Sequence, residues 1–399
     1  MSQLPALSDQ QVADYHKNGY LIIRSVLSHR EIAELRSVLQ EMAQHAAYPP
    51  SLIYPAPGKY TICGNQLAQP ELAAIAEHPT IVRAVESLLQ QQAYLTAFVA
   101  YVRTPSDQGS GAHCDYKRWR PVGSSMNWLF AIVPLVDFDA QYGPFLVSPG
   151  SHKLTQVTDE QALVKDLVRP KREDLAPFID PELKAGDLLL TNEHTWHEAP
   201  AGTSKENRYG IFNKYCAANA PPAAGYYPYN SAARTALSDA GKRLLPVCFD
   251  KEITDTRLLI ERRLGQGSEY LLIKEEAQGR WALPGGKGWE EREALWDIGA
   301  RVGSLQALTK EQLGIEIPWM SYIEDYELPN GISRLYGFTD AAADRSMPKG
   351  LNSDWYTRAQ LEQLLGADDA ICHAVETWHR DGIVRGKGKA LAQSKNQFD

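Results

Sequence analysis

The stretch that decides the fold is Gly186-Asp187-Leu188-Leu189-Leu190-Thr191, which is followed after five residues by His197. A short leucine-rich run that begins at a glycine turn is typical of a buried β-strand. Four other stretches have strand character, and turns that contain Gly or Pro separate them; they are residues 94–103, 127–136, 143–147 and 209–216. This part of the chain is therefore predicted to consist mainly of short strands.

Helical patterns come before these strands. Ser8 and Ser28 each begin a capping box, and the apolar residues after Ser28 recur at helical spacing as far as about His45. Residues 46–60 are rich in Pro and Tyr and are predicted to be a loop, whereas 71–91 are predicted to form one or two helices. Helices followed by many short strands indicate a β-sandwich or barrel with a helical flank.

The composition limits the class of protein. The chain has 399 residues with 44% hydrophobic and 23% charged residues, which is the balance of a soluble globular protein. The net charge of -8 argues against nucleic-acid binding, and the longest apolar run is too short to span a membrane. The five cysteines are scattered and the N-terminus lacks the pattern of a secretory signal, so we expect reduced thiols in the cytoplasm.

The first chemical signal is the triplet His113-Cys114-Asp115. On an extended strand, residues i and i+2 point to the same side, so one imidazole and one carboxylate can bind the same metal. His197 is the candidate for a third ligand, and two histidines with one carboxylate form the facial triad of non-haem iron oxygenases. The triplet alone is weak support, because a surface His and Asp on an unrelated strand would give the same pattern.

A basic residue adds to this signal. The open positions of such a centre must hold a 2-oxo acid and then oxygen, and the far carboxylate of 2-oxoglutarate needs a cation such as the two-pronged guanidinium of an arginine. Arg208 lies eleven residues after His197, at the start of a predicted strand. It is therefore the candidate anchor for the cosubstrate.

Residues 7–218 resemble the phytanoyl-CoA dioxygenase family. The resemblance rests on Asn18-Gly19-Tyr20-Leu21-Ile22, on the pair Arg120-Pro121, on Gly143-Pro144-Phe145-Leu146-Val147-Ser148-Pro149-Gly150-Ser151-His152, and on the segment from Gly186 to Trp196-His197. It implies a double-stranded β-helix (a jelly-roll, cupin-like fold) with flanking helices.

The resemblance also implies residue roles. By it, His113, Asp115 and His197 bind iron(II) and Arg208 binds the distal carboxylate of 2-oxoglutarate, with O2 as the second cosubstrate. Further contacts to 2-oxoglutarate are assigned to Asn127, on the strand after the triplet, and to Arg103, on the strand before it. Because related halogenases lack the carboxylate, its presence favours hydroxylation. A departure from the family is Ala199, where relatives often carry a serine.

Two neighbouring histidines and one cysteine need separate interpretations. His194 precedes His197 by three residues and would face the other way on a strand, which favours a structural role. His152 ends a Pro-Gly-Ser-His turn, where stabilising the turn is the commoner role. Cys114 lies between two ligands and is predicted to be packed away from the metal.

The substrate signal is a run of cations and aromatics beside the triplet. Lys117, Arg118 and Arg120 lie in the segment 116–120, and Lys59 with Tyr60 could join them as a lid. A basic rim of this kind suits an anionic substrate such as a phosphate, phosphonate or carboxylate. A solvated charged loop would have the same sequence, and both interpretations stay open.

A second domain is predicted after a boundary near residue 250. Its predicted strands and helices indicate an α/β fold, and Trp281-Ala282-Leu283-Pro284-Gly285-Gly286-Lys287 resembles the start of a Nudix domain, an α/β/α fold. The family's box of magnesium-binding glutamates is degenerate here, because only Glu311 remains and Gln312 stands beside it. Glu290, Glu291 and Glu293 are alternative carboxylates, although such a cluster is more often only solvated.

These observations lead to one principal hypothesis. Residues 1–250 are predicted to be an Fe(II)/2-oxoglutarate dioxygenase domain that hydroxylates a small anionic metabolite and releases succinate and CO2. Residues 251–390 are predicted to be a catalytically degenerate Nudix-like domain that binds a ligand, contacts the oxygenase domain or forms a homodimer. The alternatives are a bifunctional enzyme whose second domain hydrolyses a nucleotide-linked compound, and a binding protein without turnover.

Overall fold

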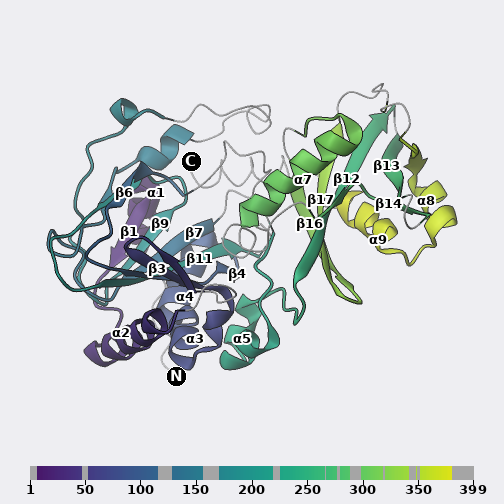
Figure 1. Cartoon of the computed structure of the whole chain (residues 1–399). Coiled ribbons are helices and arrows are strands. Elements are labelled where there is room, and N and C mark those ends of the chain that lie inside the picture. Colours follow the sequence, from purple (N-terminus) through teal and green to yellow (C-terminus); the bar gives the residue numbers. More distant parts are fainter. Residues whose placement is uncertain are drawn as a thin grey trace.

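A computed structural model describes residues 7–46, 53–115, 128–155, 170–218, 225–265, 267–275, 279–287, 298–317, 320–340, 347 and 351–379. Figure 1 shows two bodies, one built from the first part of the chain and one from the green and yellow C-terminal part. Among the described residues, no helix combines the length and the apolar character needed to cross a membrane. All five cysteines are free thiols.

The helices of the first body begin where the sequence signals predicted. Ser8 and Ser28 both form capping boxes, and Gly19 ends the first helix at a φ of 82°, a left-handed conformation that favours glycine. The region 71–91 forms two helices, each of which begins with a proline. The helices before the main strands are α1 (Asp9–Asn18), α2 (His29–Gln44), α3 (Pro70–Ala76) and α4 (Pro79–Leu89), and α5 (Ser231–Ala236) packs on this body after them.

Two antiparallel sheets follow. The larger has the order β1-β9-β7-β11-β5-β3-β2, with β4 also paired to β11, and the smaller has the order β6-β10-β8. Helices α2 and α4 pack on one face of the larger sheet, and this arrangement of two sheets with a helical flank is the predicted jelly-roll. The larger sheet contains β1 (Tyr20–Ile23), β2 (Ile53–Ala56), β3 (Lys59–Cys63), β4 (Ala93–Ala97), β5 (Val99–Arg103), β7 (Trp128–Pro134), β9 (Leu188–Asn192) and β11 (Arg208–Ala217); the smaller contains β6 (Gly109–His113), β8 (Leu146–Val147) and β10 (His197–Pro200).

The stretch from Gly186 is buried in the middle of this architecture. Strand β9 lies between β1 and β7, and all five of its residues are buried. Asp187 precedes the strand and accepts hydrogen bonds from the backbone N–H groups of Ser25 and Lys184, both at 2.9 Å, and from the guanidinium of Arg24 at 2.7 Å. The buried carboxylate therefore joins the end of β1 to the start of β9.

The prediction of a loop was wrong for residues 53–60, while 47–52 lie outside the described residues. Strands β2 and β3 form a hairpin there, and Gly58 in the turn has a φ of 75°. The prolines that suggested a loop are tolerated because β2 is the edge strand of the sheet, where a missing backbone N–H breaks no ladder. The predicted strand 94–103 is two strands that separate at Phe98, and 143–147 contains only the short β8.

The second body is a mixed seven-stranded sheet with helices. The strand order is β14-β13-β12-β17-β16, with β15 beside β12 and β18 beside β13, and β12 and β17 run parallel. The strands and helices that the structure describes in this body follow one another in chain order. They are β12 (Ile253–Leu264), β13 (Gly267–Glu275), β14 (Arg280–Ala282), β15 (Gly285–Gly286), α7 (Ile298–Leu313), β16 (Ser321–Leu328), β17 (Gly331–Asp340), β18 (Ser353–Thr357), α8 (Arg358–Leu365) and α9 (Ala370–Thr377).

The two bodies share a packed contact. Cys216 at the end of β11 and Tyr226 after it belong to the apolar core of the second sheet. Arg334 and Asp325, on β17 and β16, form an ion pair in which both side chains are at most 1% exposed, and Arg334 also donates to the backbone carbonyl of Tyr226. The buried pair therefore holds the segment that leaves the first body.

We predict that Arg334→Ala destabilises the whole chain. The substitution leaves the carboxylate of Asp325 buried without its partner, which costs about 3–5 kcal/mol. The matched control is Arg358→Ala, which removes an exposed pair with Glu362 and should cost less than about 1 kcal/mol. Urea unfolding followed by tryptophan fluorescence measures both, and equal losses in the two variants would contradict the prediction.

Candidate metal centre

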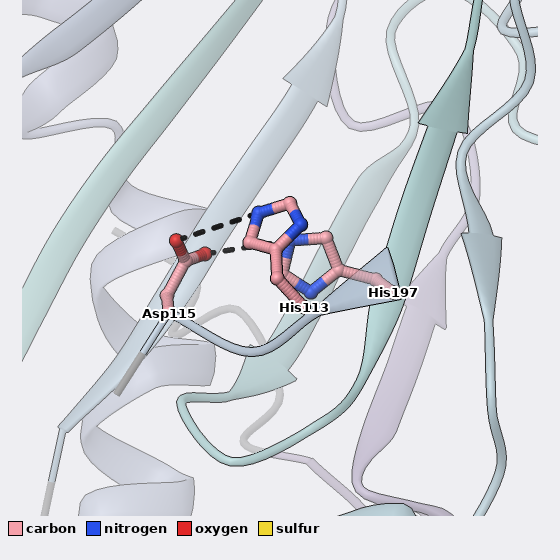
Figure 2. A group of neighbouring side chains, drawn as sticks. All are labelled: His113, Asp115 and His197. Atoms are coloured by element: carbon pink, nitrogen blue, oxygen red, sulfur yellow. Dashed lines mark ion pairs between the residues drawn. The ribbon is translucent and has the colours of Figure 1, made fainter. Parts of the chain in front are cut away.

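Strand pairing brings the two candidate histidines together. His197 begins β10 and lies opposite His113, the last residue of β6, in the antiparallel pair. Their ring centroids are 4.4 Å apart, and Asp115 lies two residues beyond the end of β6. Figure 2 shows the three side chains converging, with the carboxylate facing both rings.

The donor atoms of this group are close enough to share one ion. The Nε2 atoms of His113 and His197 lie 4.0 and 3.5 Å from the carboxylate oxygens of Asp115, and the three ligand atoms all lie within 4.8 Å of one another. Among the described residues, no other group of His, Cys, Asp and Glu side chains meets this condition. Two imidazoles and one carboxylate match the facial triad of non-haem iron(II) sites.

Backbone contacts orient both rings. Nδ1 of His113 lies 2.7 Å from the carbonyl oxygen of Gly111, and Nδ1 of His197 lies 3.0 Å from that of Thr195. When Nδ1–H donates to a carbonyl, the lone pair remains on Nε2, which is the atom that faces Asp115. The ring of Phe145 stacks on His197 with centroids 4.9 Å apart, so His197 has little room to rotate.

The triad opens into a cavity of about 160 Å³ between the two sheets. His113 and Asp115 are each 28% exposed, whereas His197 is 9% exposed. Residues of both sheets line the cavity. Among them are Phe130 and Ile132 of β7, Tyr101 and Arg103 of β5, and Arg208, Phe212 and Lys214 of β11.

Arg208 is buried on the wall of this cavity and lies over the ring of Phe138, with 3.6 Å from its Cζ to the ring centroid. Its Nε and Nη2 atoms are buried without a hydrogen-bond partner in the described chain. Burial lowers the pKa of the guanidinium, and the charge of Arg103 lowers it further. Buried donors of this kind are costly unless an anion accepts from them, so the position fits the carboxylate of a bound diacid.

Other predicted residues divide into three groups. Arg103 and Lys59 line the cavity, and Arg103 pairs with Asp107 and also donates to the carbonyl of Ala199 at 3.3 Å. Tyr60 follows Lys59 on β3 and packs against the core of the first body instead of the cavity. The predicted residues Asn127, Lys117, Arg118 and Arg120 lie outside the described residues.

His194, His152 and Cys114 do not belong to the metal-binding group. All three are buried, which agrees with structural roles. The sequence reasoning missed Tyr101, Phe212 and Lys214, which line the cavity. The sequence already carried a signal for Phe212 and Lys214. Every second residue of a strand lies on the same face, so 212 and 214 share the face of Arg208 on β11.

The sheets and the triad define a class of protein: a jelly-roll with a two-histidine, one-carboxylate metal centre. Residues 15–210 match the model of the phytanoyl-CoA dioxygenase family. An ectoine dioxygenase of Bordetella bronchiseptica is 26% identical over 156 residues, which cover 37% of this chain and 50% of that protein. Dioxygenase af480 of Aspergillus fumigatus is 26% identical over 222 residues, which cover 53% of this chain and 67% of that protein.

Solved structures also match the first body. The epimerase SnoN from nogalamycin biosynthesis has a TM-score of 0.45 and 24% identity, and the match covers 54% of this chain and 84% of SnoN. EctD from S. alaskensis has a TM-score of 0.44 and 21% identity, with 54% of this chain and 79% of EctD covered. The chain spans only half the length of the ectoine dioxygenases that it matches.

We predict that Asp115→Ala and His197→Ala each lower iron(II) affinity at least about tenfold, because each removes one of three ligands. Anaerobic titration of the purified chain with iron(II) measures the affinity. His45→Ala, at an exposed helix end, is the control and should bind iron like the wild type. Unchanged affinity in both triad variants would contradict the assignment of these ligands.

Proposed function

We propose that the chain is an Fe(II)- and 2-oxoglutarate-dependent dioxygenase that hydroxylates a small anionic metabolite and releases succinate and CO2. The observation that carries the proposal is that the triad and the buried, unpartnered donors of Arg208 line one cavity. The match of residues 15–210 to the model of a dioxygenase family supports the same reaction class. A binding protein without turnover would not need an intact triad beside such an anchor.

The protein's part in this reaction is to bind, orient and exclude water. Iron(II) with 2-oxoglutarate and O2 supplies the oxidising chemistry when bound. His113, Asp115 and His197 would hold the metal on one face, while Arg208 would donate N–H···O hydrogen bonds to the distal carboxylate. The apolar side chains Phe130, Ile132, Phe145 and Phe212 line the remaining wall and limit the access of water.

An anionic substrate is supported by the charge of the cavity wall. Four cations line it, Lys59, Arg103, Arg208 and Lys214, against two carboxylates, Asp107 and Asp115. Asp107 is paired with Arg103, and Asp115 belongs to the triad. An excess of positive charge in a closed cavity favours small anions. We place this activity in the cytoplasm, because all five cysteines are free thiols.

For the second body, from about residue 251 to 390, we propose a Nudix-like fold without hydrolase activity. Gln312 stands where the Nudix box has a glutamate, and its amide makes two hydrogen bonds of 3.0 Å, one to the N–H and one to the carbonyl of Gly285. The adjacent Glu311 is exposed on α7. Magnesium requires several oxygen ligands, and among the described residues this body has no group of three metal-binding side chains.

We predict that Arg208→Met raises the KM for 2-oxoglutarate roughly tenfold to a hundredfold, because a hydrogen bond to a charged group contributes about 1.5–3 kcal/mol. Succinate formation at varied 2-oxoglutarate measures this. Arg172→Met is the control, since Arg172 is 62% exposed and paired with Glu198 at the surface. An unchanged KM would place the anchor elsewhere, and no succinate from the iron-loaded wild type would refute the proposed reaction.

We predict no magnesium-dependent release of phosphate or nucleotide from nucleoside diphosphate derivatives. Glu311 is the one carboxylate of the Nudix box among the described residues, Glu290, Glu291 and Glu293 lie outside them, and one carboxylate provides too few ligands for the metal. Phosphate and nucleotide release assays on the wild type and on Glu311→Gln measure this, and the two proteins should behave alike. Release that needs magnesium and is lost in Glu311→Gln would instead support the bifunctional alternative.

A further inference from the structure

One face of strand β11 forms a continuous row along the cavity. Arg208, Phe212 and Lys214 all line the cavity, and Gly210 lies between them on the same face. Arg208 and Lys214 are six residues apart, which corresponds to roughly 20 Å along a strand. The cavity therefore has a cation near each end of this row.

The metal centre lines the same cavity as this row. Tyr101 of β5 pairs with Gly210 in the register of the sheet, and its ring centroid lies 4.9 Å from that of Phe212. Burial raises the pKa of Tyr101, and the nearby carboxylate of Asp115 raises it further. Tyr101 therefore packs beside the row and lines the same cavity as the triad.

This arrangement assigns different ligands to the two cations. A five-carbon diacid that reaches from Arg208 to the metal occupies only the first part of the row, so its carboxylates do not reach Lys214. Lys59 does not offer a second choice at the far end, because it pairs in register with Arg103, which pairs with Arg208. The Nζ of Lys59 lies 4.9 Å from the ring centroid of Tyr101, which pairs with Gly210, so the charge of Lys59 lies between the cosubstrate end and the middle of the row.

The surroundings of Lys214 suit the end of a substrate. Lys214 pairs in register with Phe130, and its Nζ lies 4.8 Å from the centroid of that ring. Phe212 and Ile132 form the next pair of the same two strands and also line the cavity. An apolar wall that ends in a cation fits a molecule with a carbon skeleton and a terminal oxyanion.

We propose that Lys214 binds the anionic headgroup of the substrate, a phosphate, phosphonate or carboxylate, while the carbon skeleton lies along Phe130, Ile132 and Phe212 toward the metal centre. This inference rests on the proposed function and names the residue that selects the substrate class. Lysine acts on such groups as a compact point charge. A substrate whose far end is neutral or cationic should not be selected.

The test uses the full chain loaded with iron(II) and saturating 2-oxoglutarate under anaerobic conditions, so that Arg208 is occupied and no turnover occurs. Calorimetric titrations with methylphosphonate, inorganic phosphate and acetate identify the preferred headgroup. Lys214→Met should weaken the binding of the preferred probe about tenfold or more, because a charge-assisted contact is lost. Lys214→Arg should retain most of the affinity.

The matched control is Lys205→Met, which removes the same charge from an exposed position before β11 and should leave binding unchanged. Unchanged 2-oxoglutarate affinity in Lys214→Met shows that the fold and the cosubstrate site are intact. The proposal fails if Lys214→Met and Lys205→Met bind the probe equally, if the wild type binds none of the three probes, or if binding occurs only without 2-oxoglutarate. If the wild type does not bind 2-oxoglutarate, the proposed function is refuted instead. The probe affinities of Lys214→Met and Lys205→Met then test the anion site by itself.

Discussion

The antiparallel pairing of β6 with β10 is the interaction on which the site depends. It places residue 113 opposite residue 197, although 84 positions separate them in the chain. A shift of one residue in this register would turn one imidazole to the other side of the sheet and separate the ligand atoms. The backbone carbonyls that accept from the two Nδ1 atoms belong to the same strands and turns, so the pairing also determines how the rings are turned.

Strand β11 connects three parts of the molecule. It carries the proposed cosubstrate anchor at its first residue, the proposed headgroup cation at position 214, and a cysteine that is buried in the core of the second body. A strand bonded on both sides, to β7 and β5, resists displacement because its backbone hydrogen bonds would have to break together. The second body therefore contacts the same strand that carries both proposed anion-binding residues.

The contact between the two bodies is made by buried apolar side chains and a buried ion pair. Apolar side chains from the first body enter the second core, and a buried ion pair fixes the connecting backbone. Gly225, whose φ is 88°, lies against this pair, and a Cβ there would come within 2.9 Å of Arg334. Domains joined by flexible linkers do not need such contacts, so a structural role for the second body follows whether or not it binds a ligand.

Local signals in the sequence were sufficient for the helices, their caps, most strands and the residue types of the metal centre. Capping boxes act over four residues, and a leucine run or an HxD triplet is visible without knowing its neighbours. The hairpin at 53–63 was not predicted, because its prolines indicated a loop. A strand tolerates proline mainly at the edge of a sheet, and only the assembled sheet shows which strand is at the edge. Strand order and register likewise decide four features of the site. They are the distance from His113 to His197, the burial of the Arg208 donors, the packing of Tyr60 against the core and the position of Lys214. Those are contacts between distant segments, and only the tertiary structure decides them.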